Sequence, residues 1–253
     1  RLEKMDVYTD PLNDKIKRQA AEITRLFAEN EELKKDLECY YTGTDTCDIE
    51  SARAAGQRES WELALKLAKE KDADLVLATD PDADRLGVYC KDTKSGKYVT
   101  FTGNMSAMLI AEYILGQKKA NGTMPKNPVL VESIVSTDMA KAIAAAYGVE
   151  LVEVLTGFKY IGEQMLKYEK NGEKNYVFGF EESYGCLPGT YARDKDAPAA
   201  VCMLCEVAAY YKSQGKTLWD GMIEMYEKYG YYREGIATMT LKGIDGAAQI
   251  QEI

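Results

Sequence analysis

The chain contains no histidine among its 253 residues. This absence excludes Ser-His-Asp and Cys-His catalysis, zinc sites ligated by histidine, and an imidazole group as general base. Any chemistry carried by this sequence must therefore use carboxylates, lysines, arginines, hydroxyl groups and metal ions.

Long apolar runs and an excess of positive charge are absent as well. No stretch approaches the roughly 18 apolar residues of a membrane-spanning helix, and no positively charged segment followed by an apolar one opens the chain. The net charge of −9 disfavours nucleic acid and anionic membrane surfaces as partners. A hydrophobic content of 46% and a charged content of 29% are typical of a soluble globular protein, for which we expect a cytoplasmic location.

The six cysteines are scattered along the chain. Cys202 and Cys205 form a C-x-x-C pair, but this pair lies in an apolar helical stretch over residues 197–211. Without a second pair or a histidine, zinc binding and redox chemistry are disfavoured, and we expect reduced thiols inside a hydrophobic core.

The most informative stretch is Asp74–Val88, with the sequence D-L-V-L-A-T-D-P-D-A-D-R-L-G-V. Its apolar start predicts a buried strand. The strand ends at three alternating carboxylates, Asp80, Asp82 and Asp84, and Arg85 follows directly. An acidic surface turn is the plainer alternative, but like charges so close together repel one another and favour a compensating ion. Oxygen ligands of this kind suit Mg²⁺, and Arg85 would bind a phosphate beside it.

Alternating apolar strands and amphipathic helices predict the α/β class, with two consecutive three-layer α/β units built on mostly parallel mixed sheets. A polar turn at residues 94–96 predicts a hairpin in the first unit, and the stretch 120–128, rich in Gly, Pro and Asn, is the best linker. We predict four regions: an unassigned N-terminal helical region (1–56), an α/β region with the acidic loop (57–124), a second α/β domain (125–230) and the start of an incomplete C-terminal domain (231–253).

Three polar loops follow predicted strands in the second unit. Residues 156–159, T-G-F-K, open a helix, so backbone N–H groups and a cation would face the strand end. Residues 180–185 bring Glu181 and Ser183 to the same edge, and the polar group 193–196 comes shortly after. Each loop alone would equally suit a helix N-cap with solvated charges. Together they predict a binding edge at the carboxyl ends of the strands.

Four segments resemble, in order, motifs of the alpha-D-phosphohexomutase family: D-P-D-A-D-R, T-G-F-K-Y-I, G-F-E-E-S-Y-G and A-R-D-K-D-A. They resemble the family's metal-binding loop, the start of its third domain, its sugar-recognition loop and the segment that places a lysine near the substrate. The resemblance runs from about residue 60 to the end. It implies that 57–124 is part of the second domain and that 125–230 is the sugar-binding third domain.

The resemblance also implies a cofactor, a substrate and a set of site residues. The implied cofactor is Mg²⁺, with Asp80, Asp82 and Asp84 as its ligands. The implied substrate is a phosphosugar, glucose 1-phosphate or glucose 6-phosphate, with a bisphosphate intermediate. The implied catalytic residues are Arg85, Lys159 and Lys195. The implied substrate-binding residues are Thr156, Gly157, Lys159, Glu181, Ser183, Arg193 and Lys195.

The family transfers a phosphoryl group from a phosphoserine in a T-A-S-H-N-P-like loop of its first domain, and this sequence has no such loop. We therefore expect a phosphohexomutase, interconverting the 1- and 6-phosphates of a sugar such as glucose, whose phosphoserine domain is absent from this chain. The chain alone is expected to be inactive. Two alternatives stay open: a non-catalytic sugar-phosphate-binding module and a Mg²⁺-dependent sugar phosphatase.

Overall fold

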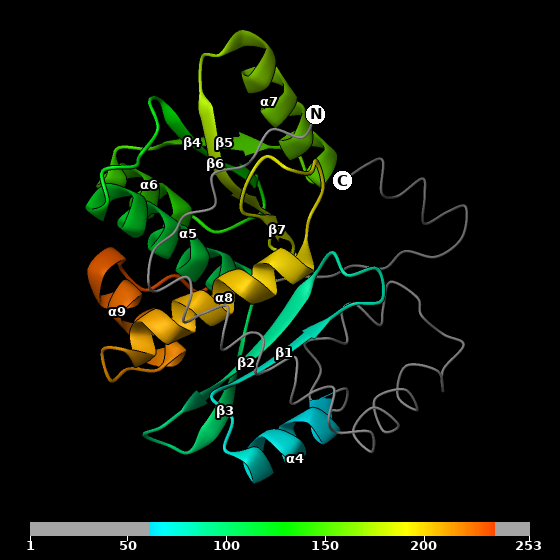
Figure 1. The fold of residues 1–253 in the computed structure, drawn as a ribbon, viewed down its shortest axis with the longest axis vertical. Helices are drawn as coiled ribbons and strands as arrows, with labels where there is room; N and C mark the ends of the chain where they lie inside the picture. Colours follow the sequence, from blue (N-terminus) through cyan, green and yellow to red (C-terminus); the bar gives the residue numbers. More distant parts are fainter. Residues whose placement is uncertain (1–60, 236–253) are drawn as a thin grey trace, which may run out of the picture.

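The computed structural model describes residues 61–235 (Figure 1). The predicted N-terminal helical region, 1–56, lies outside the described residues, as does most of the predicted C-terminal start, 231–253. The described part contains two sheets, one of three strands and one of four, with helices packed against both. None of its helices combines the length and the apolar character needed to span a membrane.

The first sheet has the strand order β1-β2-β3. Its elements are helix α4 (Glu62–Lys71), β1 (Leu75–Thr79), β2 (Leu86–Asp92) and β3 (Lys97–Phe101). Both strand pairs are antiparallel, with Thr79 opposite Leu86 and Asp92 opposite Lys97. The predicted hairpin at 94–96 is confirmed as the β2–β3 turn. The connection between β1 and β2 is a second hairpin, and it carries the predicted metal ligands.

This antiparallel pairing corrects the prediction of a mostly parallel sheet in the first unit, while the α/β class itself is confirmed. A parallel neighbour needs a crossover connection of about a dozen residues or more. The connections after β1 and β2 are far shorter, because they span only residues 80–85 and 93–96. Strands joined this closely have to turn back as hairpins.

The second sheet has the strand order β5-β4-β6-β7 and is mostly parallel, as predicted. Its strands are β4 (Pro128–Ser133), β5 (Glu150–Val154), β6 (Asn175–Phe180) and β7 (Cys186–Leu187). β4 pairs in parallel with β5 and β6, and only the short β7 runs antiparallel, against β6. β4 is buried from Val129 to Ser133, as expected for the central strand of a sheet covered on both faces.

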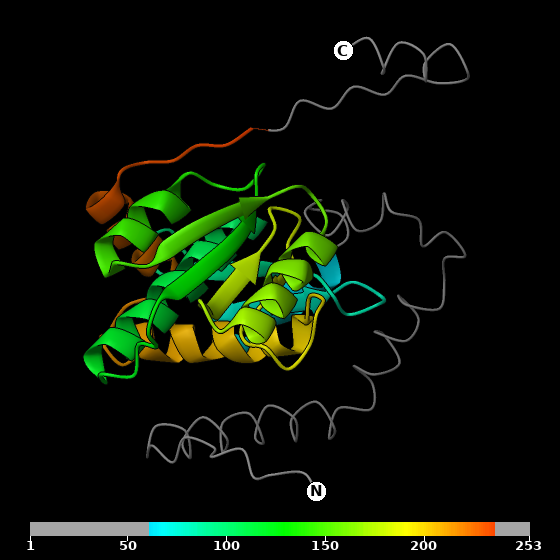
Figure 2. The ribbon, with the colours of Figure 1, turned by 90° about the horizontal axis from the view of Figure 1, so that it is seen from above.

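Helices cover both faces of the second sheet (Figure 2). They are α5 (Gly103–Ala120), α6 (Met139–Tyr147), α7 (Phe158–Asn171), α8 (Ala197–Lys212) and α9 (Leu218–Tyr229). Alternate residues of β4 point to opposite faces. Val129 and Val131 pack with Ile161 and Met165 of α7, whereas Leu130 lies in the larger core that α5, α6, α8 and α9 share.

The larger hydrophobic core connects the two sheets. Leu86, Val88 and Phe101 of the first sheet lie in the same buried cluster as residues of α5, α8 and α9. α5 precedes the predicted boundary at 124/125, but it packs against α6 and α8, which follow that boundary. The predicted domain limits stay a prediction, while the larger of the two hydrophobic clusters continues across them.

The cysteines between residues 61 and 235 are free thiols. Cys90 and Cys186 are buried as expected, and burial raises their pKa values to about 11 and about 12, so both stay protonated. The expectation of a buried thiol is wrong for Cys202, which is exposed. The reason is helical spacing: α8 buries Ala200 and Leu204, and Cys202 falls between them on another side of the helix.

Candidate functional site

Acidic side chains meet in the connection between β1 and β2, residues 80–85, here called the 80–85 loop. Asp80, Asp82 and Asp84 each offer a carboxylate oxygen, and these oxygens lie within 4.8 Å of one another. The loop folds around Asp80, whose Oδ1 accepts hydrogen bonds from the backbone N–H groups of Asp84 at 3.1 Å and Arg85 at 3.0 Å. The structure therefore brings the predicted metal ligands together.

Ala83 turns this loop in a strained conformation. Its φ of 56° lies in the left-handed region, which costs a residue with a Cβ about 1–2 kcal/mol. Two backbone hydrogen bonds hold it there. The N–H of Ala83 donates to the carbonyl of Asp80 at 3.0 Å, and the carbonyl of Ala83 accepts the N–H of Ala197, the first residue of α8, at 3.0 Å. A loop of the first unit is thus tied to a helix of the second.

The carboxylates of the 80–85 loop are short of positive charge. The side chain of Asp80 is only 6% exposed. Burial raises the pKa of Asp80, the hydrogen bond from the Arg85 backbone opposes this, and the Asp84 and Asp82 carboxylates raise it further. The Oδ1 atom of Asp84 is buried and accepts no hydrogen bond from any described residue. A divalent cation bound by the three oxygens would lower the pKa of Asp80 and would give Oδ1 of Asp84 a partner. Hard oxygen donors of this kind fit Mg²⁺.

Two protein cations flank the acidic cluster. Arg85 Nε lies 3.6 Å from Asp84 Oδ1, and Lys195 Nζ lies 2.9 Å from Asp84 Oδ2. Lys195 comes from the segment between β7 and α8, so the second unit supplies a charge to the loop of the first. Burial disfavours its ammonium form, but hydrogen bonds to Asp84 and Asp194 outweigh burial and raise the pKa of Lys195. This lysine is therefore charged at neutral pH.

The stem of Lys195 is positioned by two neighbours. A Cβ on Gly185 would lie 2.0 Å from Cδ of Lys195, so the stem in this position needs the room that glycine leaves. The ammonium group lies 5.5 Å from the ring centroid of Phe158, the first residue of α7. The Lys195 side chain is only 11% exposed, with its charged end at the acidic cluster.

The connection between β6 and β7, residues 181–185 and here called the 181–185 loop, carries a second polar group. Glu181 is buried, and its Oε1 accepts the N–H of Gly157 at 2.8 Å, which ties this loop to the start of α7. Burial raises the pKa of Glu181, while the Gly157 hydrogen bond lowers it. The carbonyl of Tyr184 accepts the N–H of Leu86 at 3.0 Å. The 181–185 loop therefore contacts both units.

Two residues that support the 181–185 loop were not among the predicted site residues. Ser133, at the end of β4, donates a hydrogen bond to Oε2 of Glu182 at 2.9 Å. Gly103 begins α5 so close to the loop that a Cβ would lie 2.2 Å from the carbonyl oxygen of Glu182. Ser133 had a signal in the sequence, since it is a polar residue shortly after the apolar run 129–131. Gly103 is identified only by its packing.

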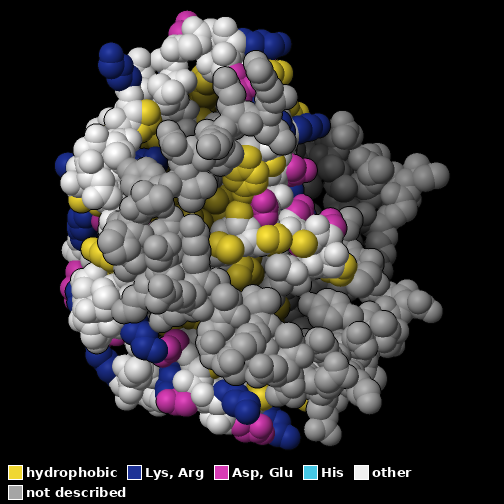
Figure 3. All heavy atoms as spheres, in the orientation of Figure 1, with side chains coloured by type: hydrophobic (Ala, Val, Ile, Leu, Met, Phe, Trp, Pro, Cys, Tyr) yellow, Lys and Arg dark blue, Asp and Glu magenta, His cyan; other side chains and the backbone are white. Residues whose placement is uncertain are grey.

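Several predicted substrate-binding residues lie around the start of α7 and in the 181–185 loop. Thr156 and Lys159 are exposed around the start of α7, and the Lys159 ammonium lies 4.9 Å from the ring centroid of Tyr160. Ser183 is partly buried in the 181–185 loop. Acidic and hydrophobic side chains are exposed next to one another near the middle of the face shown in Figure 3. This face of the molecule offers both charge and apolar contact.

Arg193 is not brought into the cluster. Its guanidinium donates hydrogen bonds to the carbonyls of Thr190 at 2.8 Å and Ala192 at 3.0 Å, and it pairs with the carboxylate of Glu169 on α7. Close backbone packing holds the segment there, because a Cβ on Gly162 of α7 would lie 2.7 Å from the Arg193 carbonyl oxygen. In this structure Arg193 joins its segment to α7.

Two family models match the chain. The model of the phosphoglucomutase/phosphomannomutase alpha/beta/alpha domain III matches residues 102–229, and the model of domain II matches residues 43–96. The chain belongs to the phosphoglucomutase/phosphomannomutase family. This confirms the resemblance inferred from the four sequence motifs. The domain III match includes α5, in agreement with the packing of α5 against α6 and α8.

Phosphoglucomutase from Staphylococcus aureus strain MRSA252 is 35% identical to this family member over 205 residues, which make up 81% of this chain and 36% of that enzyme. The chain thus spans about a third of the length of the curated relatives it matches. A protein described as a phosphomannomutase from Thermus thermophilus has a TM-score of 0.55 and 23% identity, covering 73% of this chain and 39% of that one. A phosphoglucomutase/phosphomannomutase family protein from Burkholderia thailandensis gives 0.50 and 20%, covering 68% and 33%. At these identities the solved structures show a shared fold.

Proposed function

We propose that this chain is the metal- and phosphosugar-binding part of a phosphohexomutase. The reaction is the interconversion of a sugar 1-phosphate and a sugar 6-phosphate, with glucose as the sugar, through an enzyme phosphoserine and a bisphosphate intermediate. The phosphoserine loop is not in this sequence. The observation that carries the proposal is the convergence of Asp80, Asp82 and Asp84 with Arg85 and Lys195, in a chain of the phosphoglucomutase/phosphomannomutase family.

Asp80, Asp82 and Asp84 would hold Mg²⁺ at the 80–85 loop. When bound, the ion supplies positive charge for the oxygens of the phosphoryl group that moves. Arg85 shares this task, because a planar guanidinium suits two-point binding of phosphate oxygens. Its Nε atom is buried 3.6 Å from Oδ1 of Asp84 and makes no hydrogen bond within residues 61–235, while the Arg85 side chain as a whole is 33% exposed.

Lys195 would bind the sugar oxygen that gains or loses phosphate. Because Asp84 and Asp194 outweigh the effect of burial and keep its pKa above the ordinary value, Lys195 holds its proton at neutral pH. An ammonium of this kind serves as a hydrogen-bond donor that stabilises negative charge on the sugar oxygen, rather than as a general base. The room left by Gly185 fixes the position from which it acts.

Glu181 and Ser183 would bind hydroxyl groups of the sugar. Oε1 of Glu181 is engaged by Gly157, which leaves Oε2 to accept a hydroxyl. Thr156, Gly157 and Lys159 surround the start of α7, where backbone N–H groups and the positive end of the helix dipole favour an anion. The acidic loop of one unit would thus face the reacting phosphate while the second unit holds the sugar and its other phosphate.

Calorimetric titration of the 253-residue chain with Mg²⁺, glucose 1-phosphate and glucose 6-phosphate tests the proposal. We expect Asp82→Asn to weaken Mg²⁺ binding about tenfold or more, because one of three charged ligands is lost. Asp138→Asn is the matched control, since Asp138 is an exposed acid paired with Lys141. We expect Glu181→Ala to weaken the binding of both sugar phosphates. Unchanged affinities in both variants would refute the proposal.

Activity assays on the same chain distinguish the mutase from the two alternatives. Release of inorganic phosphate from glucose 6-phosphate in the presence of Mg²⁺ would indicate a sugar phosphatase instead. Binding of sugar phosphates without any isomerisation, after addition of a phosphoserine domain from a relative, would indicate a non-catalytic module. Isomerisation without phosphate release would support the mutase.

A further inference from the structure

Exposed aliphatic side chains gather at the carboxyl ends of β4 and β5. Ile134, Val135 and Leu155 are 55%, 51% and 58% exposed, and they are here called the apolar edge. The N–H of Ile134 donates to the carbonyl of Val154 at 2.8 Å, which places the two loops side by side. Within residues 61–235, Leu63 is the only other leucine, isoleucine or valine that is more than half exposed. The apolar edge is therefore a local concentration of exposed aliphatic surface.

The apolar edge has no role in the site proposed for the phosphosugar. Side chains of isoleucine, valine and leucine offer no hydrogen bond to phosphate or hydroxyl oxygens. Single exposed apolar side chains are normal on a protein surface, whereas neighbouring ones mark surfaces that contact other protein segments. Their removal from water favours contact with further apolar side chains. The edge therefore fits a partner that presents an apolar face.

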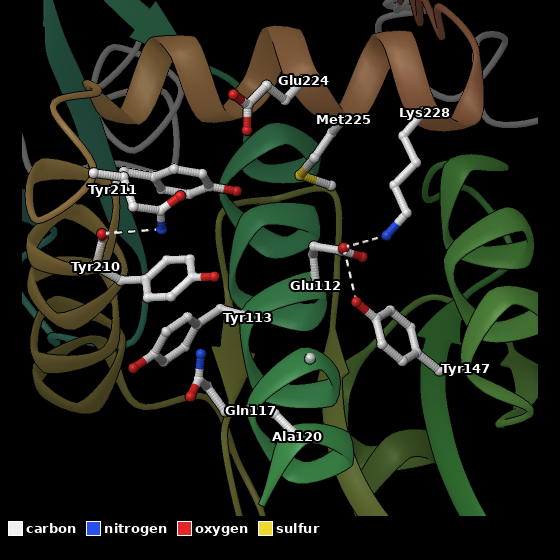
Figure 4. A pocket seen from close by; sticks show the side chains of 12 residues that line it. Glu112, Tyr113, Gln117, Ala120, Tyr147, Tyr210, Tyr211, Glu224, Met225 and Lys228 are labelled. Carbon is white, nitrogen blue, oxygen red and sulfur yellow. Dashed lines mark hydrogen bonds and ion pairs between the residues drawn. The ribbon is translucent and has the colours of Figure 1, made fainter.

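The last turn of α9 is attached to two other helices by the carboxylate of Glu112 on α5. Its Oε1 accepts a hydrogen bond from the Lys228 ammonium of α9 at 2.7 Å, and its Oε2 accepts the Tyr229 hydroxyl at 2.7 Å. Oε1 also accepts the Tyr147 hydroxyl of α6 at 2.8 Å (Figure 4). The chain therefore leaves α9 from a position that α5 and α6 fix.

The segment after α9 runs from this position to the apolar edge. The ring of Tyr231 meets Tyr226 of α9 edge to face, with centroids 4.9 Å apart. Further along, the carboxylate of Glu234 accepts a hydrogen bond from the hydroxyl of buried Thr137. Thr137 follows Ile134 by three residues, which span at most about 11 Å. In Figure 2 this segment, at the red end of the colour scale, runs along the outside of the second unit. The chain is therefore beside the apolar edge when it reaches the end of the described part.

The next residues in the sequence, 236–241, read I-A-T-M-T-L. In an extended segment alternate side chains point to opposite sides. Ala237, Met239 and Leu241 would then share one side, with Thr238 and Thr240 on the other. Such an alternation of apolar and polar residues is typical of a strand with one buried face. Six extended residues span up to about 20 Å, which is enough to cross the apolar edge.

We propose that residues 236–241 lie across the apolar edge as an extended segment, with their alternating apolar side chains against it. The connection is short, because Glu234 is already held by Thr137, and a short connection loses little entropy when it closes. Residues 1–60 enter the described part at the first sheet instead, where Trp61 meets Tyr89 with ring centroids 5.0 Å apart. The contact would attach the C-terminal region to the second unit whether or not a phosphosugar is bound.

Hydrogen exchange of the 253-residue chain, measured by mass spectrometry, tests this contact. We expect peptides covering 236–241 to exchange more slowly than an unstructured chain. The double variant Ile134→Ser/Leu155→Ser should raise their exchange rate about tenfold, because two apolar contacts are lost. Leu63→Ser is the matched control and should leave this rate unchanged, since Leu63 is 53% exposed on α4 of the first unit. The replaced side chains are exposed, so the hydrophobic core stays intact.

Methyl NMR spectra of Ile134 and Leu155 give the reciprocal test. Met239→Ser should shift these methyl signals, whereas Thr240→Ser, on the other side of the segment, should leave them in place. Exchange of 236–241 at the rate of an unstructured chain, or equal protection in the double variant, would overturn the proposal. Protection that rises with protein concentration would overturn it in favour of a second copy of the chain. Loss of protection in residues 1–60 of the double variant, with 236–241 unaffected, would overturn it in favour of the N-terminal region.

Discussion

Replacement of Gly103 by alanine should displace the 181–185 loop. The added methyl group would lie 2.2 Å from the carbonyl oxygen of Glu182 and 2.6 Å from the backbone nitrogen of Tyr184, whereas real Cβ atoms essentially never approach closer than 3.0 Å. The atoms in the way belong to the backbone and cannot rotate aside. Either the start of α5 or the loop has to move by roughly 1 Å, as overpacked sites do.

The cost follows from two opposing effects. Overpacking that forces a backbone shift costs about 1–3 kcal/mol. Alanine favours the helix and restricts the unfolded chain, which offsets at most about 1 kcal/mol. We therefore expect the free energy of unfolding of Gly103→Ala to fall by about 1–2 kcal/mol. The hydrogen bond from the Leu86 N–H to the Tyr184 carbonyl, 3.0 Å long, should be strained in the same variant.

Urea denaturation followed by tryptophan fluorescence measures this change. Gly116→Ala is the matched control, because Gly116 lies in the same helix and its Cβ would meet only the Tyr147 hydroxyl, at 3.3 Å. That hydroxyl is the end of a side chain, so the control should stay within about 1 kcal/mol of the unchanged protein. A Gly103→Ala protein with unaltered stability and unaltered binding of glucose 6-phosphate would refute the reasoning.

Two further predictions concern charged side chains. Glu132 of β4 is 2% exposed, and burial raises its pKa from 4.5 to about 8. The folded state then holds this proton more tightly than the unfolded state, so its contribution to stability is full below pH 4.5 and is lost as the pH rises through about 8. Glu132→Gln should be close to the unchanged protein near pH ~5 and exceed its free energy of unfolding by ~4 kcal/mol near pH ~9 in urea titrations. Parallel pH profiles would contradict this. In calorimetry, Lys195→Met should weaken glucose 6-phosphate binding about tenfold and Arg193→Met less than about twofold, because Glu169 engages Arg193. A larger loss for Arg193→Met would show that its guanidinium leaves Glu169 when the substrate binds.

The 80–85 loop could be predicted from the sequence because what forms it is local. An apolar run ends at Thr79, and the carboxylates then alternate, so strand, turn and ligand set can be read from neighbouring residues. The antiparallel pairing of β1 with β2 could have been derived too, since their connection is too short for a crossover. The prediction of a mostly parallel sheet was wrong for the first unit alone, because it considered the helix before β1 and not the length of the connection after it.

The approach of Lys195 to Asp84 follows from no local pattern. It depends on the room that Gly185 leaves for the lysine stem, which only the packed structure shows. Arg193 lies two residues earlier and points to Glu169 on α7, because side-chain direction depends on the backbone and on nearby partners rather than on spacing along the chain. Glu132 was missed for a related reason. It follows an apolar strand run, and its burial arises from the helices that cover the sheet.

Each of the two loops of the candidate site packs against the start of a helix that follows the sheet of the other unit in the chain. α5 leaves the first sheet and begins against the 181–185 loop, while α8 leaves the second sheet and begins against the 80–85 loop. A change in the conformation of either loop would therefore disturb its packing against a helix that the other unit positions. A chimera that joins the first unit of one relative to the second unit of another would combine parts that do not match at these contacts. We therefore expect a change in one of these loops to need a compensating change at the helix start that contacts it.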